Sequence, residues 1–290
     1  MVVRRIPNDL CPWRDLIIMD YRCLYLKKGQ GTCASASSLH SQGVDEPLSD
    51  TGFRQADAAG MYLSHIRFTH VFTSDLIRAK QATSILRNSQ HCKEIPVKCD
   101  ARLRERKYGV AEGRPLSDLK AMAKEAGEPY LSFTPPGGET LDEVKARVQD
   151  FFEYLCNLVA QEARLEKQVS PGTKADAETA EGCSAASFPN HHGEPESDPN
   201  SEGAAGGGLA ANILVVSHGA YMRNWIGYFV SDLQCSLPAM LTKAELSSVT
   251  PNTGISRFIV KLEMKESLLP PRILCLSLNR SDHLRDMSDS

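Results

Sequence analysis

Helix-like and strand-like segments alternate along most of the chain, and this alternation constrains the fold more than any other feature of the sequence. Helical apolar periodicity recurs in residues 48–66, 76–88, 116–127, 140–167 and 221–233. Short apolar runs typical of strands occupy residues 68–74, 95–99, 212–217, 255–263 and 272–279. Because strands that alternate with helices form parallel sheets covered by those helices, we expect one α/β domain around a largely parallel central sheet.

Local signals mark the starts of two of these helices. Ser49 or Asp50 is the expected N-cap of the first helix, and Thr140 with Glu143 forms the capping-box pair of the fourth. Residues 168–210 are rich in Ser, Gly, Ala, Glu and Pro and show no hydrophobic period, which predicts a disordered insertion within the domain. His191 and His192 in this insertion lack the spacing of a metal site, so no metal is expected.

Composition excludes several classes of function. The net charge is -3, and the densest basic run, residues 102–107, already contains Glu105, so no nucleic-acid partner is predicted. No apolar stretch approaches the roughly 20 residues that a membrane helix needs. The nine cysteines are an odd count without a CxxC pair, which indicates free thiols in a reducing compartment such as the cytosol.

Three polar clusters follow predicted strands, and they carry Arg78, Glu105 and His218. The carboxyl ends of parallel strands meet in one crevice of the sheet. A guanidinium, a carboxylate and an imidazole together suit phosphoryl transfer, because they bind phosphate oxygens, supply a proton and place a nitrogen. Taken singly, Arg78 could cap a helix, Glu105 could pair with a neighbouring arginine, and His218 could be a satisfied core histidine.

These clusters, together with "GVDEPLSDTG" at 43–52, "TPPGGET" at 134–140 and "TPNTG" at 250–254, resemble the histidine phosphatase superfamily, also called the phosphoglycerate mutase-like family. The resemblance runs from Gly43 to about Lys167 and from Ala211 to about Asn279. It implies the three-layer phosphoglycerate mutase-like fold and a domain over 43–290. Residues 1–42 are expected to be a divergent segment outside it.

The resemblance also implies roles for single residues. Arg78 corresponds to the second phosphate-binding arginine, Glu105 to the proton donor for the leaving sugar oxygen, and His218 to the second histidine, which stabilises the transferring phosphoryl group. Gly138 and Glu139 correspond to the substrate-side loop, although helix capping explains that stretch equally well. Asn252 corresponds to a pocket-lining or structural amide.

The implied activity needs no cofactor and acts on a small phosphorylated sugar or glycolytic metabolite, with fructose-2,6-bisphosphate as the expected substrate. The resemblance gives no indication of protein partners.

The nucleophile of the family is a histidine in an Arg-His-Gly motif at the end of the first strand, and this motif is absent from the chain. Counting back from Gly43 at the family spacing leads to Lys28, where Lys27, Lys28 and Gly29 stand in the place of the motif after the strand-like "CLYL" at 23–26. His40 lies several residues beyond that turn. A protonated lysine binds phosphate but is a poor nucleophile. An alternative or incorrect start of the chain explains the departure better than a replaced nucleophile.

Three functions follow from these observations. The first is a phosphatase that lacks its nucleophile in this version of the chain. The second is a binding module that holds a phosphorylated compound or a protein without turnover. The third is a phosphoglycerate mutase, which the long insertion disfavours.

Overall fold

The computed structural model describes residues 13–20, 43–86, 95–169, 211–239, 241, 251–263 and 268–287 of the chain. Its strands are β1 (Trp13–Asp20), β2 (His70–Thr73), β3 (Val97–Cys99), β4 (Asn212–Ser217), β5 (Ile255–Lys261) and β6 (Arg272–Arg280). Its α-helices are α1 (Asp50–Tyr62), α2 (Ile77–Leu86), α3 (Leu116–Glu125), α4 (Leu141–Val169) and α5 (Gly219–Ser231). Short 3₁₀ helices are η1 (Ala101–Leu103), η2 (Gly109–Ala111) and η3 (Asp282–Met287).

The described strands form one six-stranded sheet in the order β3-β2-β4-β1-β5-β6. The first four strands in that order run parallel to their neighbours, whereas β5 and β6 are antiparallel. The expectation of an α/β fold with a largely parallel sheet is therefore confirmed. The strands β2, β4 and β1 all end at one edge, because Thr73 pairs with Val216 and Asp20 pairs with Ser217.

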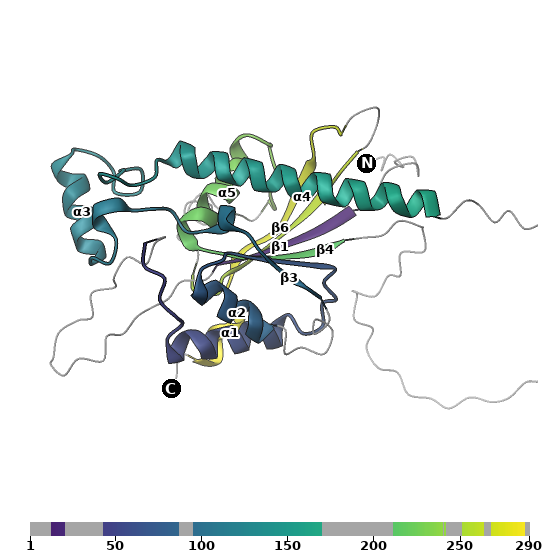
Figure 1. Cartoon of the computed structure of the whole chain (residues 1–290), viewed down its shortest axis with the longest axis horizontal. Helices are drawn as coiled ribbons and strands as arrows, with labels where there is room; N and C mark the ends of the chain where they lie inside the picture. Colours follow the sequence, from purple (N-terminus) through teal and green to yellow (C-terminus); the bar gives the residue numbers. More distant parts are fainter. Residues whose placement is uncertain are drawn as a thin grey trace, which may run out of the picture.

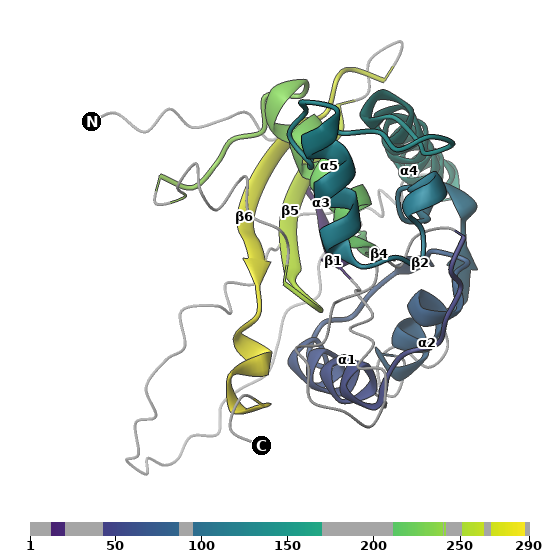
Figure 2. The same cartoon turned by 90° about the vertical axis from the view of Figure 1, so that its left-hand side faces the viewer.

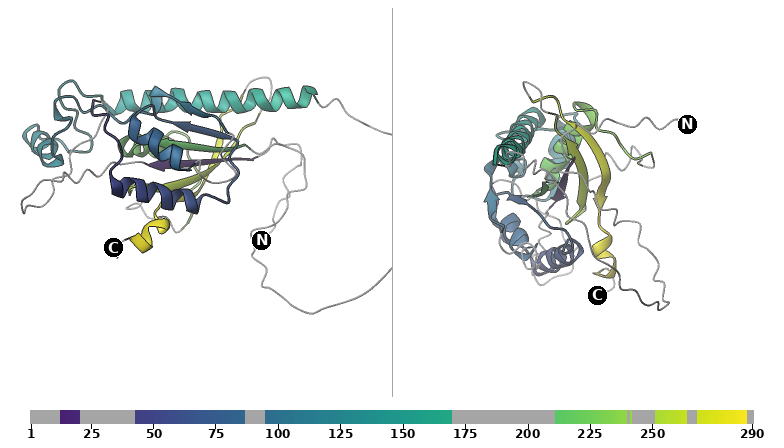
Figure 3. Two further views of the ribbon diagram at one scale, coloured as in Figure 1. Left: turned by 60° about the horizontal axis from the view of Figure 1, so that its bottom comes forward. Right: turned by 90° about the vertical axis from the view of Figure 1, so that its right-hand side faces the viewer.

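Helices cover both faces of the sheet, so the fold has three layers (Figures 1 and 3). Helices α4 and α5 lie on one face, where Phe151, Trp225 and Phe229 stack edge to face in the larger core. Helices α1 and α2 lie on the other face over a smaller core of Ala, Leu and Val side chains. The segment that contains α3 lies beyond the carboxyl edge of the parallel strands and has its own small apolar cluster (Figure 2).

Local sequence signals explain where the helices begin. Ser49 is the N-cap of α1, and its hydroxyl accepts a hydrogen bond from the Gly52 amide. The capping box of α4 is formed as expected: the Thr140 amide donates to the Glu143 carboxylate, and the Glu143 amide donates to the Thr140 hydroxyl. Helix α4 ends at Val169, so residues 168 and 169 belong to the helix and not to the predicted insertion.

This correction to the insertion boundary has a local cause, because Pro171 and Gly172 are the first helix-breaking residues in the sequence after α4. Residues 170–210 lie outside the described part of the chain, and their predicted disorder stays a prediction.

Strand β1 was not anticipated from the sequence. It comes from the segment that the sequence analysis separated from the domain, yet it lies near the centre of the sheet between β4 and β5. Its continuous apolar run of four residues, 16–19, is flanked by Arg14, Asp15 and Asp20, and a run this short between charged residues gives a weak strand signal. The strand-like run at 23–26 lies outside the described residues, and residues 13–20 occupy the position in the sheet that was considered for it.

Two further expectations from the sequence concern membrane-spanning helices and free cysteines. None of the helices that the structure describes is both long and apolar enough to cross a membrane. Four cysteines fall within the described residues, and Cys99, Cys156, Cys235 and Cys275 are free thiols.

Replacing Tyr221 by Phe should change the free energy of unfolding by less than about 0.5 kcal/mol. The Tyr221 hydroxyl is buried without a hydrogen-bond partner among the described residues, so its removal leaves no group unpaired. Phe229→Ala, in the same core, should cost about 3–5 kcal/mol as the control. Urea unfolding measures both values. A loss above about 1.5 kcal/mol for Tyr221→Phe would show that the hydroxyl has a partner.

Candidate active site

The loops that follow β2, β3 and β4 lie side by side at the carboxyl edge of the sheet. The Ser74 amide donates to the Val216 carbonyl, and the Asp100 amide donates to the Thr73 carbonyl, so each loop begins where its strand leaves the ladder. The buried Ser217 hydroxyl donates to the Leu103 carbonyl at 2.8 Å. These bonds hold the residues after β3 against the end of β4.

Glu105 is buried against the N-terminus of α5. Its carboxylate accepts hydrogen bonds from three backbone amides: Arg106 at 2.8 Å, Tyr221 at 3.0 Å and Ala220 at 3.1 Å. The last two belong to the first turn of α5, whose backbone N–H groups have no carbonyl partner within the helix. The segment after β3 is thereby attached to the helix that follows β4.

His218 is the N-cap residue of α5 and is 1% exposed. Strand β4 is buried from Ile213 to Ser217, and the burial continues through His218 and Gly219 into the first turn of α5. The same backbone turn carries His218 and presents the Ala220 amide to Glu105, so these two side chains share one site.

Arg78 lies in the first turn of α2 and is 1% exposed, which is unusual for an arginine. Its Nη1 donates to the Val44 carbonyl at 2.9 Å. The next residue of that loop, Asp45, accepts a hydrogen bond from the Ile77 amide at the start of the helix. The segment before α1 therefore binds both the Arg78 guanidinium and the start of the helix that carries it.

Gly138 and Glu139 lie beside the segment that follows Glu105. Gly138 forms an isolated antiparallel bridge with Tyr108, and an added Cβ would stand 2.9 Å from the Pro135 carbonyl oxygen, so the close approach requires glycine. The Glu139 carboxylate forms a bidentate ion pair with Arg147, at 2.6 and 2.8 Å. Among the described contacts Glu139 therefore binds protein groups.

Asn252 lies in the turn before β5. This turn is at the same edge as the other loops, because Ile255 pairs with Met19 near the end of β1. The Asn252 amide donates to the Gln55 side chain on α1, and the next residue, Thr253, has a positive φ of 52°.

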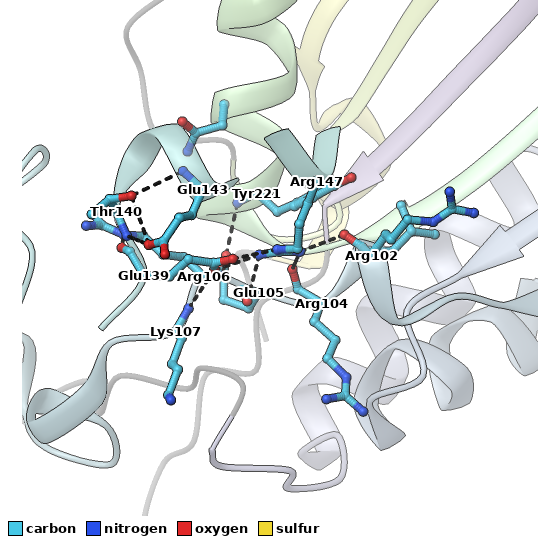
Figure 4. A network of polar contacts seen from close by, with 12 residues as sticks. Arg102, Arg104, Glu105, Arg106, Lys107, Glu139, Thr140, Glu143, Arg147 and Tyr221 are labelled. Atoms are coloured by element: carbon cyan, nitrogen blue, oxygen red, sulfur yellow. Dashed lines mark hydrogen bonds and ion pairs between the residues drawn. The ribbon is translucent and has the colours of Figure 1, made fainter. Parts of the chain in front are cut away.

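Sequence reasoning missed two ion pairs at this edge. Arg104 donates to both carboxylate oxygens of Asp75, at 2.7 and 2.6 Å, and these hydrogen bonds lower the pKa of Asp75. The pair joins the loop after β2 to the segment that carries Glu105. The second missed ion pair joins Arg147 to Glu139. The only sequence signal for it is the position of Arg147, eight residues after Glu139. In Figure 4 the side chains of Arg104 and Lys107 point away from the network around Arg147.

The register of β1 fixes the position where a nucleophile of the expected kind would stand. Asp20 is the last residue of β1 and pairs with Ser217, so one further residue of strand would reach the level of His218. In the sequence that next residue is Tyr21, and no histidine precedes His40. Lys27, Lys28 and His40, which the sequence analysis considered, lie outside the described residues.

No group of three or more potential metal ligands occurs within the described ranges. The candidate active site thus consists of a buried arginine in the first turn of α2, a buried carboxylate in the segment after β3 and a buried histidine at the N-cap of α5.

The chain matches the histidine phosphatase superfamily (branch 1) over residues 31–165. It is 50% identical to the fructose-2,6-bisphosphatase TIGAR of Mus musculus over 268 residues, which cover 91% of this chain and 96% of the relative. It is 52% identical to the protein of the same name from Xenopus laevis over 250 residues, covering 86% and 89%.

Among solved structures, phosphoglycerate mutase from Bacillus anthracis shares the fold. Its TM-score is 0.60 at 15% identity, with 96% of this chain and 97% of that chain covered. The similarity places the described sheet and helices in the phosphoglycerate mutase-like fold.

Protonation of His283 should weaken the turn that carries Asn252. The His283 Nε2 lies 2.7 Å from the Thr253 hydroxyl, and burial lowers the pKa of His283. Because the unfolded state then binds protons more readily, stability is retained above about pH 6.5 and falls as the pH drops below it. Between pH 7.5 and pH 5 the free energy of unfolding of the native chain should fall by up to about 1 kcal/mol more than that of His283→Gln.

Urea unfolding at the two pH values measures this difference, and the other histidines cancel in the comparison. Equal losses for the native chain and His283→Gln would contradict the assignment.

Proposed function

Because the chain belongs to the histidine phosphatase superfamily, we propose that it carries the pocket of a sugar-phosphate phosphatase of the TIGAR type. The proposed substrate is fructose-2,6-bisphosphate, whose 2-phosphate would be removed, an activity that lowers glycolytic flux. The observation that carries the proposal is the attachment of Glu105 to the α5 amides directly after His218, at the edge where Arg78 also stands.

The three side chains have two tasks: some bind the phosphate (capture), and others take part in moving the phosphoryl group (transfer). Arg78 and His218 supply positive charge and N–H donors for the phosphate oxygens. Glu105 supplies the proton that the sugar oxygen needs when its bond to phosphorus breaks. In the complete reaction an imidazole nitrogen forms the new bond to phosphorus, and water later displaces the phosphoryl group from it. No cofactor takes part in this scheme. The free thiols of the described cysteines suit a reducing compartment, and we propose the cytosol.

The imidazole for that covalent step is absent from the beginning of the chain. Strand β1 ends in Asp20, and the sequence continues with Tyr21 and Arg22 in place of an Arg-His-Gly motif. Loss of a covalent nucleophile from a catalytic unit can cost on the order of a million-fold in turnover. We therefore propose that the chain binds phosphorylated sugars but hydrolyses them very slowly.

A second candidate function is a binding module without turnover, and the sequence after β1 favours it. Arg78, Glu105 and His218 would then hold a phosphorylated metabolite as a sensor. The two candidates share the same pocket and differ only in whether the covalent step occurs. A phosphoglycerate mutase is a weaker third candidate, because it also needs the phosphohistidine.

Building the motif at the position given by the β1 register should create phosphatase activity. In the register-guided variant, Asp20→Arg, Tyr21→His and Arg22→Gly place an imidazole one residue beyond the Asp20–Ser217 pair. In the spacing-guided variant, Lys27→Arg and Lys28→His create the motif next to the existing Gly29. Release of phosphate from fructose-2,6-bisphosphate should rise by at least about 1000-fold in the register-guided variant and stay near the native level in the other.

The controls separate the candidates. Glu105→Gln in the register-guided variant should remove most of the gained activity, since a general acid contributes about 100- to 10,000-fold. Full activity of the native chain would show that another group replaces the nucleophile. Activity only in the spacing-guided variant would show that Lys28 marks the site and that the β1 register does not.

A further inference from the structure

All five N–H donors of the Arg147 guanidinium are engaged, and three of them bind the backbone that leads to Glu105 (Figure 4). The Nη1 group donates to the carbonyls of Arg102 at 2.6 Å and Arg104 at 3.1 Å. The Nη2 group donates to the Glu105 carbonyl at 3.5 Å and to Glu139 Oε2 at 2.8 Å, and Nε donates to Glu139 Oε1 at 2.6 Å. The side chain is 20% exposed.

Arg147 also contacts the residue that holds the other end of Glu105. Its guanidinium lies 5.1 Å from the centre of the Tyr221 ring, and the Tyr221 amide donates to the Glu105 carboxylate. One side chain from α4 thus contacts both the backbone of Glu105 and the residue that binds its carboxylate.

Glu139 extends this support to the residues after Glu105. Its carboxylate accepts from the Lys107 amide at 3.2 Å, its own amide donates to the Lys107 carbonyl, and its carbonyl accepts from Arg106 Nε at 2.8 Å. Arg147 and Glu139 therefore fix the chain on both sides of Glu105.

We infer that Arg147, with Glu139 as its partner, is a positioning residue that sets the place of Glu105 for proton transfer to the leaving oxygen. This inference rests on the phosphatase function proposed above. It reassigns the Glu139 carboxylate from substrate binding to support of Glu105. Arg147 itself touches neither Arg78 nor His218 in the described contacts, so it acts on transfer and not on phosphate capture.

The geometry requires arginine. A planar guanidinium reaches three carbonyls and a carboxylate in fixed directions, whereas a lysine ammonium has three donors and acts as a point charge. Arg147→Lys keeps the charge opposite Glu139 but cannot make all five contacts. It is therefore the variant that tests positioning with the least disturbance of folding.

The first experiment measures steady-state kinetics in the register-guided variant. Arg147→Lys and Arg147→Gln should lower kcat on the order of 100-fold, because a displacement of about 1 Å at a reacting group has an effect of that size. KM should change less than about threefold, since the capture residues are untouched. Arg164→Lys, an exposed arginine on the same helix, is the matched control and should leave kcat unchanged.

The second experiment separates positioning from a general structural role. In the Glu105→Gln background, Arg147→Gln should have almost no further effect on kcat, because the acid through which it acts is already gone. An equal loss of kcat in both backgrounds would overturn the inference. So would a rise in KM with kcat unchanged.

A third measurement does not depend on turnover and uses Arg147→Lys and Arg164→Lys in the chain that keeps its native residues 20–22. Hydrogen exchange at the Ala220 and Tyr221 amides should be several-fold faster in Arg147→Lys than in Arg164→Lys, while titration with inorganic phosphate gives the same affinity for both. Absence of activity in the register-guided variant would refute the proposed function, and this measurement would still test the inference. Unchanged exchange at the two amides would refute the positioning role itself.

Discussion

The hydrogen bonds between the Glu105 carboxylate and the first turn of α5 hold the candidate site together. They attach the segment after β3 to the helix after β4, alongside the Ser217–Leu103 hydrogen bond and the shared apolar core that contains Leu103 and Tyr221. A carboxylate at a helix N-terminus satisfies amides that have no partner within the helix, so one group caps α5 and enters the site. Stability and chemistry thus depend on the same atoms.

The loops around this contact repeat one arrangement. A parallel strand ends, and the polar side chain that follows it is fixed by an acidic or carbonyl group from a neighbouring loop. Arg104 is fixed by Asp75, and Arg78 by the Val44 carbonyl. Because each loop binds its neighbour, charged side chains are held at the rim of a hydrophobic core with little freedom.

The alternation of segments and the local capping signals were sufficient to predict the α/β class, the parallel strands and the cap at Thr140, and they narrowed the first cap to Ser49 or Asp50, of which the structure has Ser49. The strand at 13–20 could not be predicted in that way. Its apolar part is only four residues long, and its stability comes from β4 and β5, which lie far away in the sequence. The candidate site residues after the strands, Arg78, Glu105 and His218, were predicted from their chemistry, and their roles stay proposals. Arg147 was not predicted, because three of its five hydrogen bonds are with backbone carbonyls that carry no sequence signal.

The position of β1 also shapes how the chain reaches its folded state. Ribosomes make residues 13–20 first, but their partners in β4 begin at Asn212 and those in β5 end at Lys261. The apolar residues 16–19 can pair with β4 only after Ser217 has emerged, and with β5 only after the segment that ends at Lys261 has emerged. Contacts of such long range slow folding and leave an unpaired strand open to aggregation. The nascent chain should therefore depend on chaperones until its last strands have been synthesised.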